Sequence, residues 1–199
     1  MSIRYLIVLV SWLLASRVFA QKPLTLRSPD GQLTFRFRLT PQAPVYTVAF
    51  HGKPVVTESP LGLVFQPGGA WGAGLRQVSA QASVTDEFYS LPVGKASRVR
   101  NHYRQLRIAL REGGPGRLVY LVVRAYDDGL AFRYEFPAQK DWTSYVLTDE
   151  NSTFHLAGDP TLLTLFRPSY TTSHEGFYSR LPLSKVKADT LLDLPTLVQ

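Results

Sequence analysis

Residues 33–40 read Leu-Thr-Phe-Arg-Phe-Arg-Leu-Thr. Apolar and polar side chains alternate at every step, and successive side chains of a β-strand point to opposite faces. This stretch therefore predicts a strand with one face in a core. Residues 28–31 before it read Ser-Pro-Asp-Gly, and glycine supplies the positive φ that a tight hairpin turn requires. We expect the strand to pair antiparallel with an earlier one that contains Leu24 and Leu26.

The same signals recur along the chain. Further extended segments are expected at residues 45–50, 54–56, 61–65, 78–89, 99–111, 118–123, 131–136, 144–147 and 152–156. Glycine-, proline- and aspartate-containing turns separate them, whereas residues 66–74 are expected to form a loop and residues 157–183 an irregular region. No segment has a clear helical period. Roughly ten strands at intervals of ~8–12 residues predict an all-β, antiparallel sandwich or barrel.

The N-terminal residues differ from the rest. Arg4 precedes the apolar residues 5–14, and residues 18–20, Val-Phe-Ala, form a small-x-small cleavage pattern, which indicates a signal peptide over residues 1–20. The apolar run is about half the ~20 residues that span a bilayer, so we expect no membrane anchor. We expect an exported protein, periplasmic or extracellular, with one domain over residues 21–199. The closing residues 191–199 resemble the start of a strand, so we expect this domain to be incomplete at its C-terminal end.

Composition narrows the choice of function. The chain has 199 residues, a formal net charge of +7 and no cysteine, which excludes disulfides, thiolate chemistry and cysteine-ligated zinc. Sixteen of its 22 basic residues are arginine, a residue suited to planar recognition of carboxylates or to stacking. Nucleic acid is not an expected partner of an exported chain, and the arginines of residues 98–111 are better explained as a solvated strand.

No catalytic or metal-binding constellation is evident. Glycosidases need two carboxyl groups on opposite sides of a glycosidic bond. The adjacent acidic pairs here are Asp86-Glu87, Asp127-Asp128 and Asp149-Glu150. Neighbours on a strand point to opposite faces, and carboxylates at Asp-Gly turns are solvated, so no pair places both groups on one substrate. The four histidines lack metal-ligand spacing, and His51 is explained as a turn residue.

Aromatic residues supply candidates for sugar binding, because flat exposed rings pack against the apolar faces of pyranoses. The candidates are Trp71, Trp142, Tyr170, His174, Glu175 and Tyr178. The two tryptophans could equally fill a core, and the residues of the C-terminal segment could instead cover a sheet edge.

Several segments together resemble a known family. They are residues 27–31 (RSPDG), 52–55 (GKPV), 59–63 (SPLGL), 99–103 (VRNHY), 124–134 (RAYDDGLAFRY) and 149–150 (DE). In order and spacing they resemble the N-terminal domain of glycoside hydrolase family 97, a family of exported α-glucosidases and α-galactosidases. The resemblance covers most of residues 24–199.

The resemblance implies a β-super-sandwich of the galactose-mutarotase type, which in the whole enzyme packs on a (β/α)₈ barrel. It also implies that the acid and base carboxylates lie in that barrel, and that a calcium-binding glutamate lies beyond the segment that resembles residues 194–199. No catalytic residue, metal ligand or cofactor is therefore expected in this chain, and calcium is expected only in a full-length member. The expected function is carbohydrate binding, with an α-glucan or a galactoside as partner.

Two alternatives remain open. One is a mutarotase-like enzyme, in which His102 or His174 and Glu150 or Glu175 exchange protons with a sugar. The other is a structural fragment without activity, whose open sheet edge pairs with another chain or aggregates.

Overall fold

The computed structural model describes residues 22–114, 116–140 and 142–199. The expected signal peptide at residues 1–20 lies outside these ranges and stays a prediction. The described residues form an almost entirely antiparallel β-structure, which confirms the predicted fold class. Among them, no helix is long and apolar enough to cross a membrane.

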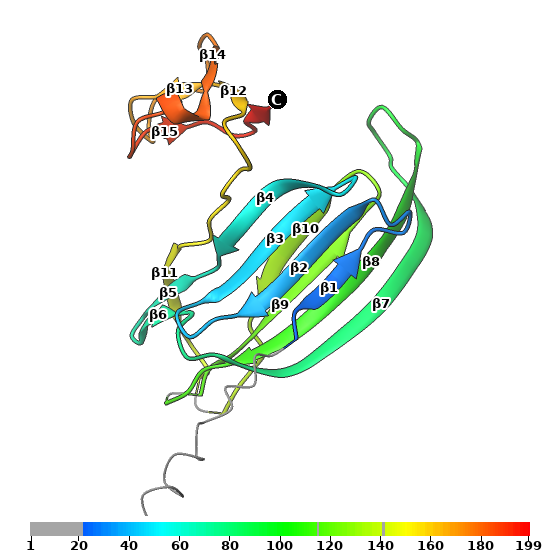
Figure 1. Ribbon diagram of the computed structural model, residues 1–199, viewed down its shortest axis with the longest axis vertical. Helices are drawn as coiled ribbons and strands as arrows, with labels where there is room; N and C mark the ends of the chain where they lie inside the picture. Colours follow the sequence, from blue (N-terminus) through cyan, green and yellow to red (C-terminus); the bar gives the residue numbers. More distant parts are fainter. Residues whose placement is uncertain (1–21, 115, 141) are drawn as a thin grey trace, which may run out of the picture.

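The first sheet is a meander of four strands in chain order (Figure 1). Its strands are β1 (Leu24–Arg27), β2 (Leu33–Leu39), β3 (Pro44–Phe50) and β4 (Lys53–Pro60). Along β2, Phe35 and Phe37 are buried, whereas Arg36 and Arg38 are exposed. The alternation in the sequence is therefore the alternation between core and solvent.

The predicted hairpin turns are confirmed. Between β1 and β2, the Ser28 hydroxyl accepts a hydrogen bond from the Leu33 amide at 3.0 Å, and Gly31 takes a φ of 79°. The Asp30 amide donates to Asp127 at 2.8 Å, which joins this turn to a turn of the second sheet. Between β3 and β4, His51 and Gly52 both have positive φ, the backbone of a two-residue turn of type I′.

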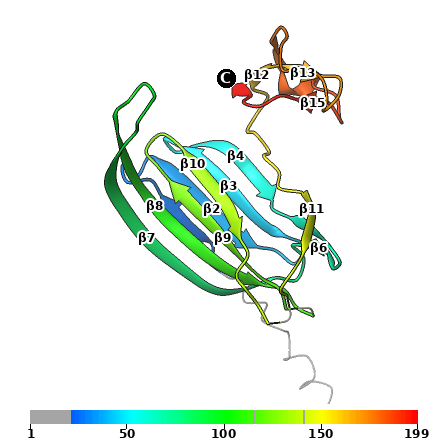
Figure 2. The ribbon, with the colours of Figure 1, turned by 180° about the vertical axis from the view of Figure 1, so that it is seen from behind.

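The second sheet has the order β10-β9-β8-β7. Its strands are β7 (Arg76–Ser90), β8 (Arg98–Arg111), β9 (Leu118–Ala125) and β10 (Leu130–Glu135). The two sheets lie face to face, and β7 and β8 extend beyond the first sheet as a long hairpin (Figure 2). β9 buries Leu121 and Val123 on one face and Val122 on the other, as its continuous apolar sequence predicts.

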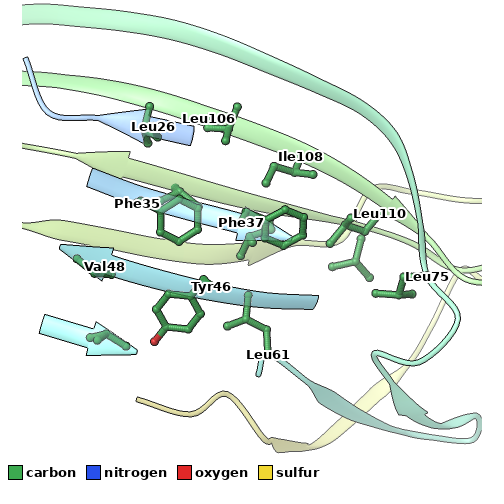
Figure 3. Packing of buried hydrophobic residues seen from close by; sticks show 14 of the residues in the cluster. Leu26, Phe35, Phe37, Tyr46, Val48, Leu61, Leu75, Leu106, Ile108 and Leu110 are labelled. Carbon is green, nitrogen blue, oxygen red and sulfur yellow. The ribbon is translucent and has the colours of Figure 1, made fainter. Parts of the chain in front are cut away.

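The core lies between the sheets. Leu26, Phe35, Phe37, Tyr46 and Val48 of the first sheet meet Leu106, Ile108 and Leu110 of β8 (Figure 3). Burial raises the pKa of Tyr46 to about 12, and its hydroxyl donates to the Thr153 carbonyl at 2.8 Å. The polar end of this side chain is therefore satisfied inside an apolar environment.

A third, small sheet closes one end of the sandwich and corrects two predictions. It contains β5 (Leu63–Gln66), β6 (Gly69–Trp71) and β11 (Val146–Glu150) in the order β11-β5-β6. The prediction of a loop over residues 66–74 is wrong for residues 69–71, which form β6. Only residues 67–68 form a turn before the chain pairs with β5. The strand expected at residues 144–147 begins two residues later, at Val146.

Residues 152–156, expected to be a strand, run extended beside β4 without forming a regular strand. The His155 carbonyl accepts from the Thr57 amide at 2.7 Å, and the Ala157 amide donates to the Val55 carbonyl at 3.0 Å. A single bridge, between Val56 and Leu156, joins this segment to β4. The outer edge of β4 is thereby covered.

Residues 161–199 form two small sheets apart from the sandwich, which an extended connection reaches (Figures 1 and 2). They contain β12 (Thr161–Thr164), β13 (Phe166–Arg167), β14 (Ser179–Pro182), the 3₁₀ turn η2 (Leu183–Lys185), β15 (Leu191–Leu192) and β16 (Leu197–Val198). We call residues 161–199 the C-terminal unit. The region expected to be irregular, residues 157–183, thus contains β12, β13 and β14; β12 pairs with β14 inside it, and β13 pairs with β15 beyond it.

Candidate functional site

Trp71 does not lie at a binding surface. It is the last residue of β6, its side chain is 1% exposed, and its ring packs against Tyr134 with the centroids 6.0 Å apart. The expectation that Trp71 contacts sugar is therefore corrected, because a ring inside the core cannot reach a ligand. The alternative interpretation, that Trp71 fills the core, is confirmed.

Trp142 is half-buried in an aromatic cluster at the same end of the sandwich. Its ring stacks on Tyr145 with centroids 4.7 Å apart and meets Phe65 edge-on at 5.2 Å. Its remaining surface lines a shallow depression together with Arg111 and Lys140. Trp142 thus serves mainly in packing, with one edge toward solvent.

The other four candidates lie together on residues 168–178, which connect β13 to β14 and which we call the aromatic loop. Tyr170 is 87% exposed and Tyr178 is 59% exposed. Phe177, next to Tyr178, is also exposed, and so are His174 and Glu175. Large exposed aromatic side chains grouped in one segment are typical of a contact surface.

A charged cluster lies beneath the aromatic loop. Nδ1 of His174 lies 2.8 Å from Oδ2 of Asp193, and Nη1 of Arg167 lies 3.6 Å from the same oxygen. Arg167 also donates to the Thr172 carbonyl within the loop. The Arg167 side chain is 5% exposed, whereas that of His174 is 74% exposed. Asp193 therefore bridges a buried cation and an exposed imidazole.

Strand pairing brings this cluster together. In the register of β13 and β15, Arg167 lies opposite Leu191, which places Asp193 near the base of the loop. The Asp193 amide donates to the Leu165 carbonyl at 2.9 Å and fixes the position of the carboxylate. Neither Arg167 nor Asp193 is predicted as a site residue from the sequence, since the two-residue strands β13 and β15, at which they lie, have no periodic signal.

The hydrogen bond from His174 is the main cause that holds the pKa of Asp193 below its ordinary value of 3.8, and the charges of His174 and Arg167 act in the same direction. Since the pKa is lowered on folding, the ionised carboxylate stabilises the folded form above about pH 4. This contribution is lost as the pH falls through the lowered pKa.

Replacing His174 with alanine is expected to raise the pKa of Asp193 toward its ordinary value, because the largest stabilising contact of the carboxylate is removed. A carboxyl-carbon NMR titration measures this. Asp159 is the internal control: the pKa of Asp159 is lowered by hydrogen bonds from Ser184 and should not move in the variant. An unchanged Asp193 titration would contradict the assigned contact.

Two charged side chains of the long β7–β8 hairpin have structural partners. Asp86 accepts two hydrogen bonds from Arg100, each of 2.7 Å, and the guanidinium carbon of Arg107 lies 3.4 Å from the centroid of Tyr120. These contacts fit an ordinary solvated strand. In the described part of the chain, no group of three or more histidine or acidic side chains lies close enough together to hold a metal ion.

Comparison with known proteins adds to this geometry. A family model described as glycosyl-hydrolase 97 N-terminal matches residues 26–199. The chain belongs to this family. The resemblance stated from the sequence is thereby confirmed.

Among relatives of this family 97 domain is a retaining alpha-galactosidase of Bacteroides thetaiotaomicron, 29% identical over 192 residues, with 90% of this chain and 27% of that protein covered. A probable retaining alpha-galactosidase of Streptomyces bingchenggensis is 30% identical, with 89% of this chain and 28% of that protein covered. The chain thus spans about a quarter of the length of these curated relatives.

Solved structures show the same fold. A glycoside hydrolase family 97 enzyme of Pseudoalteromonas sp. strain K8, in complex with panose, matches with a TM-score of 0.74 at 24% identity, with 81% of this chain and 25% of that chain covered. A beta-arabinopyranosidase matches with a TM-score of 0.69 at 24% identity, with 78% of this chain and 26% of that chain covered. The family 97 domain therefore has the fold of about a quarter of each of these longer chains.

Proposed function

We propose that this family 97 domain binds carbohydrate through the aromatic loop of its C-terminal unit, as the N-terminal module of an exported α-glycosidase. The observation that carries the proposal is the grouping of Tyr170, His174 and Tyr178 on one exposed segment above the buried cation Arg167. The signal-peptide pattern of residues 1–20 supports export to the periplasm or the exterior. The names of the two curated relatives support an α-galactoside as ligand. The complex of the Pseudoalteromonas enzyme with panose supports a ligand of the α-glucan type.

The chemistry of the loop suits a sugar. The rings of Tyr170 and Tyr178 offer apolar faces for the C–H groups of a pyranose. The Asp193 carboxylate accepts hydrogen bonds from hydroxyl groups, and His174 contacts Asp193 through Nδ1, so Nε2 is the ring nitrogen available for a ligand. In this proposal the acid and base carboxylates, the (β/α)₈ barrel and the calcium ligands belong to the remainder of the enzyme.

Binding is tested by isothermal titration of the chain with methyl α-galactoside and with panose. We expect a saturable response to one of them, and replacing Tyr170 or Tyr178 with alanine is expected to weaken it about tenfold, or by about 1.4 kcal/mol. Tyr89→Ala is the matched control, since Tyr89 is an exposed tyrosine at the far end of β7. A response equally reduced by Tyr89→Ala, or no response to either sugar, would contradict the proposal.

The contact between His174 and Asp193 favours one second candidate, proton exchange of the mutarotase type. Of the residues proposed for it from the sequence, His174 has a carboxylate partner, but this partner is Asp193. A carboxylate that orients an exposed imidazole is a typical arrangement for general acid–base catalysis. Polarimetry of freshly dissolved α-galactose or α-glucose tests it: faster equilibration that His174→Ala abolishes would support it, and the spontaneous rate would exclude it.

A further inference from the structure

β7 is a long strand at the edge of its sheet. Its 15 residues pair with β8 along one side, and no other strand of the described residues pairs with its outer side. Figures 1 and 2 both show it at the margin of the sandwich. Its outer side therefore presents a row of backbone N–H and C=O groups that another strand could use.

The other edges of the two large sheets carry protection that residues 79–85 of β7 lack. β1 is short, β10 carries Arg133 and Glu135, and residues 153–157 cover β4. Short strands, charges and covering segments are the usual means by which proteins block edge pairing. Residues 77–85 of β7 contain no charge, proline or glycine, and their one irregularity is a bulge between Gln77 and Ser79.

The exposed part of β7 is also symmetric in sequence. Residues 78–84 read Val-Ser-Ala-Gln-Ala-Ser-Val, the same in both directions, and all seven side chains are exposed. When two copies of this segment pair antiparallel, their chains run in opposite directions. If a two-fold axis passes through Gln81, valine faces valine, serine faces serine and alanine faces alanine in every pair of this segment.

We propose that β7 is a homodimerisation edge, which pairs antiparallel with β7 of a second copy about a two-fold axis at Gln81. From residue 79 to residue 83 the facing residues have the same parity along the strand, so their side chains lie on the same side of the joint sheet. Val78 belongs to the bulge and lies outside this regular part. Valine and serine pairs across strands are favourable, and the alanines leave the backbones free to approach. The β10-β9-β8-β7 sheets of the two copies become one continuous sheet. Because the interface is self-complementary, the assembly closes as a dimer.

The charges at the ends of the segment select this register. Arg76 precedes the uncharged residues, and Asp86 and Glu87 follow them. An axis shifted to Ser83 would place Asp86 opposite Ala80 and Glu87 opposite Ser79, and so would bring acidic groups over the uncharged segment. With the axis at Gln81, none of the three charged residues faces residues 78–84 of the second copy.

Single cysteines test the register, because the natural chain has none. Directly opposed residues of antiparallel strands have Cα atoms about 4.5–5.5 Å apart, within the range of a disulfide. Gln81→Cys is therefore expected to form a covalent dimer under mild oxidation. Ser79→Cys lies on the same strand, but its two copies would be about 14 Å apart along the strands, so it should form at least about tenfold less dimer.

A mixture of Ser79→Cys and Ser83→Cys chains should recover the crosslink as a heterodimer, since these positions face each other in the proposed register. The proposal would be overturned if a sample of Ser79→Cys chains crosslinked as well as a sample of Gln81→Cys chains. The absence of crosslinking in Gln81→Cys would also overturn it. Far-UV circular dichroism shows that each variant is folded.

Sedimentation velocity of the unoxidised chain gives an independent test. We expect a dimer that dissociates in Gln81→Lys and in Gln81→Glu, because each places two like charges at the axis, and that forms again when these two variants are mixed. Gln42→Lys, an exposed position between β2 and β3, is the control and should stay dimeric. A monomeric parent chain, or a ladder of higher oligomers, would overturn the proposal.

Discussion

Replacing Trp71 with alanine is expected to lower the free energy of unfolding by about 3–5 kcal/mol, the range for removing a large aromatic side chain from a core. Trp71 is among the largest fully buried side chains of the described residues. It closes the end of the sandwich where β6 pairs with β5, with Leu63 opposite. The cavity left by alanine is lined by apolar groups, which lose their packing contacts.

Urea unfolding followed by far-UV circular dichroism measures this effect without relying on tryptophan fluorescence. Trp71→Phe is expected to lose less stability, because the indole nitrogen of Trp71 is buried without a hydrogen-bond partner among the described residues and phenylalanine removes that unsatisfied donor. Val93→Ala, at a position 82% exposed, is the control and should change little. If Trp71→Ala kept full stability, the core assignment would be wrong.

Replacing Arg117 with methionine is expected to lower the free energy of unfolding by a similar amount, about 3–5 kcal/mol. The side chains of Arg117 and Glu112 are 5% and 9% exposed, and Nη2 of Arg117 lies 2.6 Å from Oε1 of Glu112. Arg117 also donates to the Gly68 carbonyl at 3.0 Å, and its guanidinium lies 5.0 Å from the centroid of Phe65. Its removal leaves a buried carboxylate without a counter-charge.

The double variant Glu112→Leu with Arg117→Met separates the ion pair from the packing. With both charges gone, no buried charge stays uncompensated, so the double variant should regain most of the lost stability. Arg38→Met is the control, because the ion pair of Arg38 with Glu58 is exposed and such pairs contribute about 0–1 kcal/mol. A loss of stability in the double variant equal to the sum of the losses in Glu112→Leu and Arg117→Met would contradict a coupled buried pair.

Much of the sandwich could be predicted because its signals are local. The alternation of residues 33–40 depends on the geometry of a single strand, and the turn at His51 and Gly52 depends on two positive φ angles. The segment at residues 124–134 contains the turn of the β9–β10 hairpin and also carried the family resemblance. The family and the all-β class followed from such features.

The candidate site was less predictable. The sequence indicated the exposed aromatic loop, but it gave no means to decide between core and surface for Trp71. An aromatic residue in a glycine-rich stretch suits both positions, and burial depends on which strand lies opposite. The pairing of Arg167 with Asp193 joins residues that are far apart in the chain, through strands of two residues each.

The sequence by itself determined the strand alternation, the hairpin turns and the membership of family 97, because each rests on the conformation of a few consecutive residues or on their order. Only the tertiary structure decided which aromatic side chains are buried, which charges meet, and that the symmetric segment of residues 78–84 lies on an open edge. These properties depend on contacts between residues distant in the chain, and such contacts exist only once the sheets have assembled.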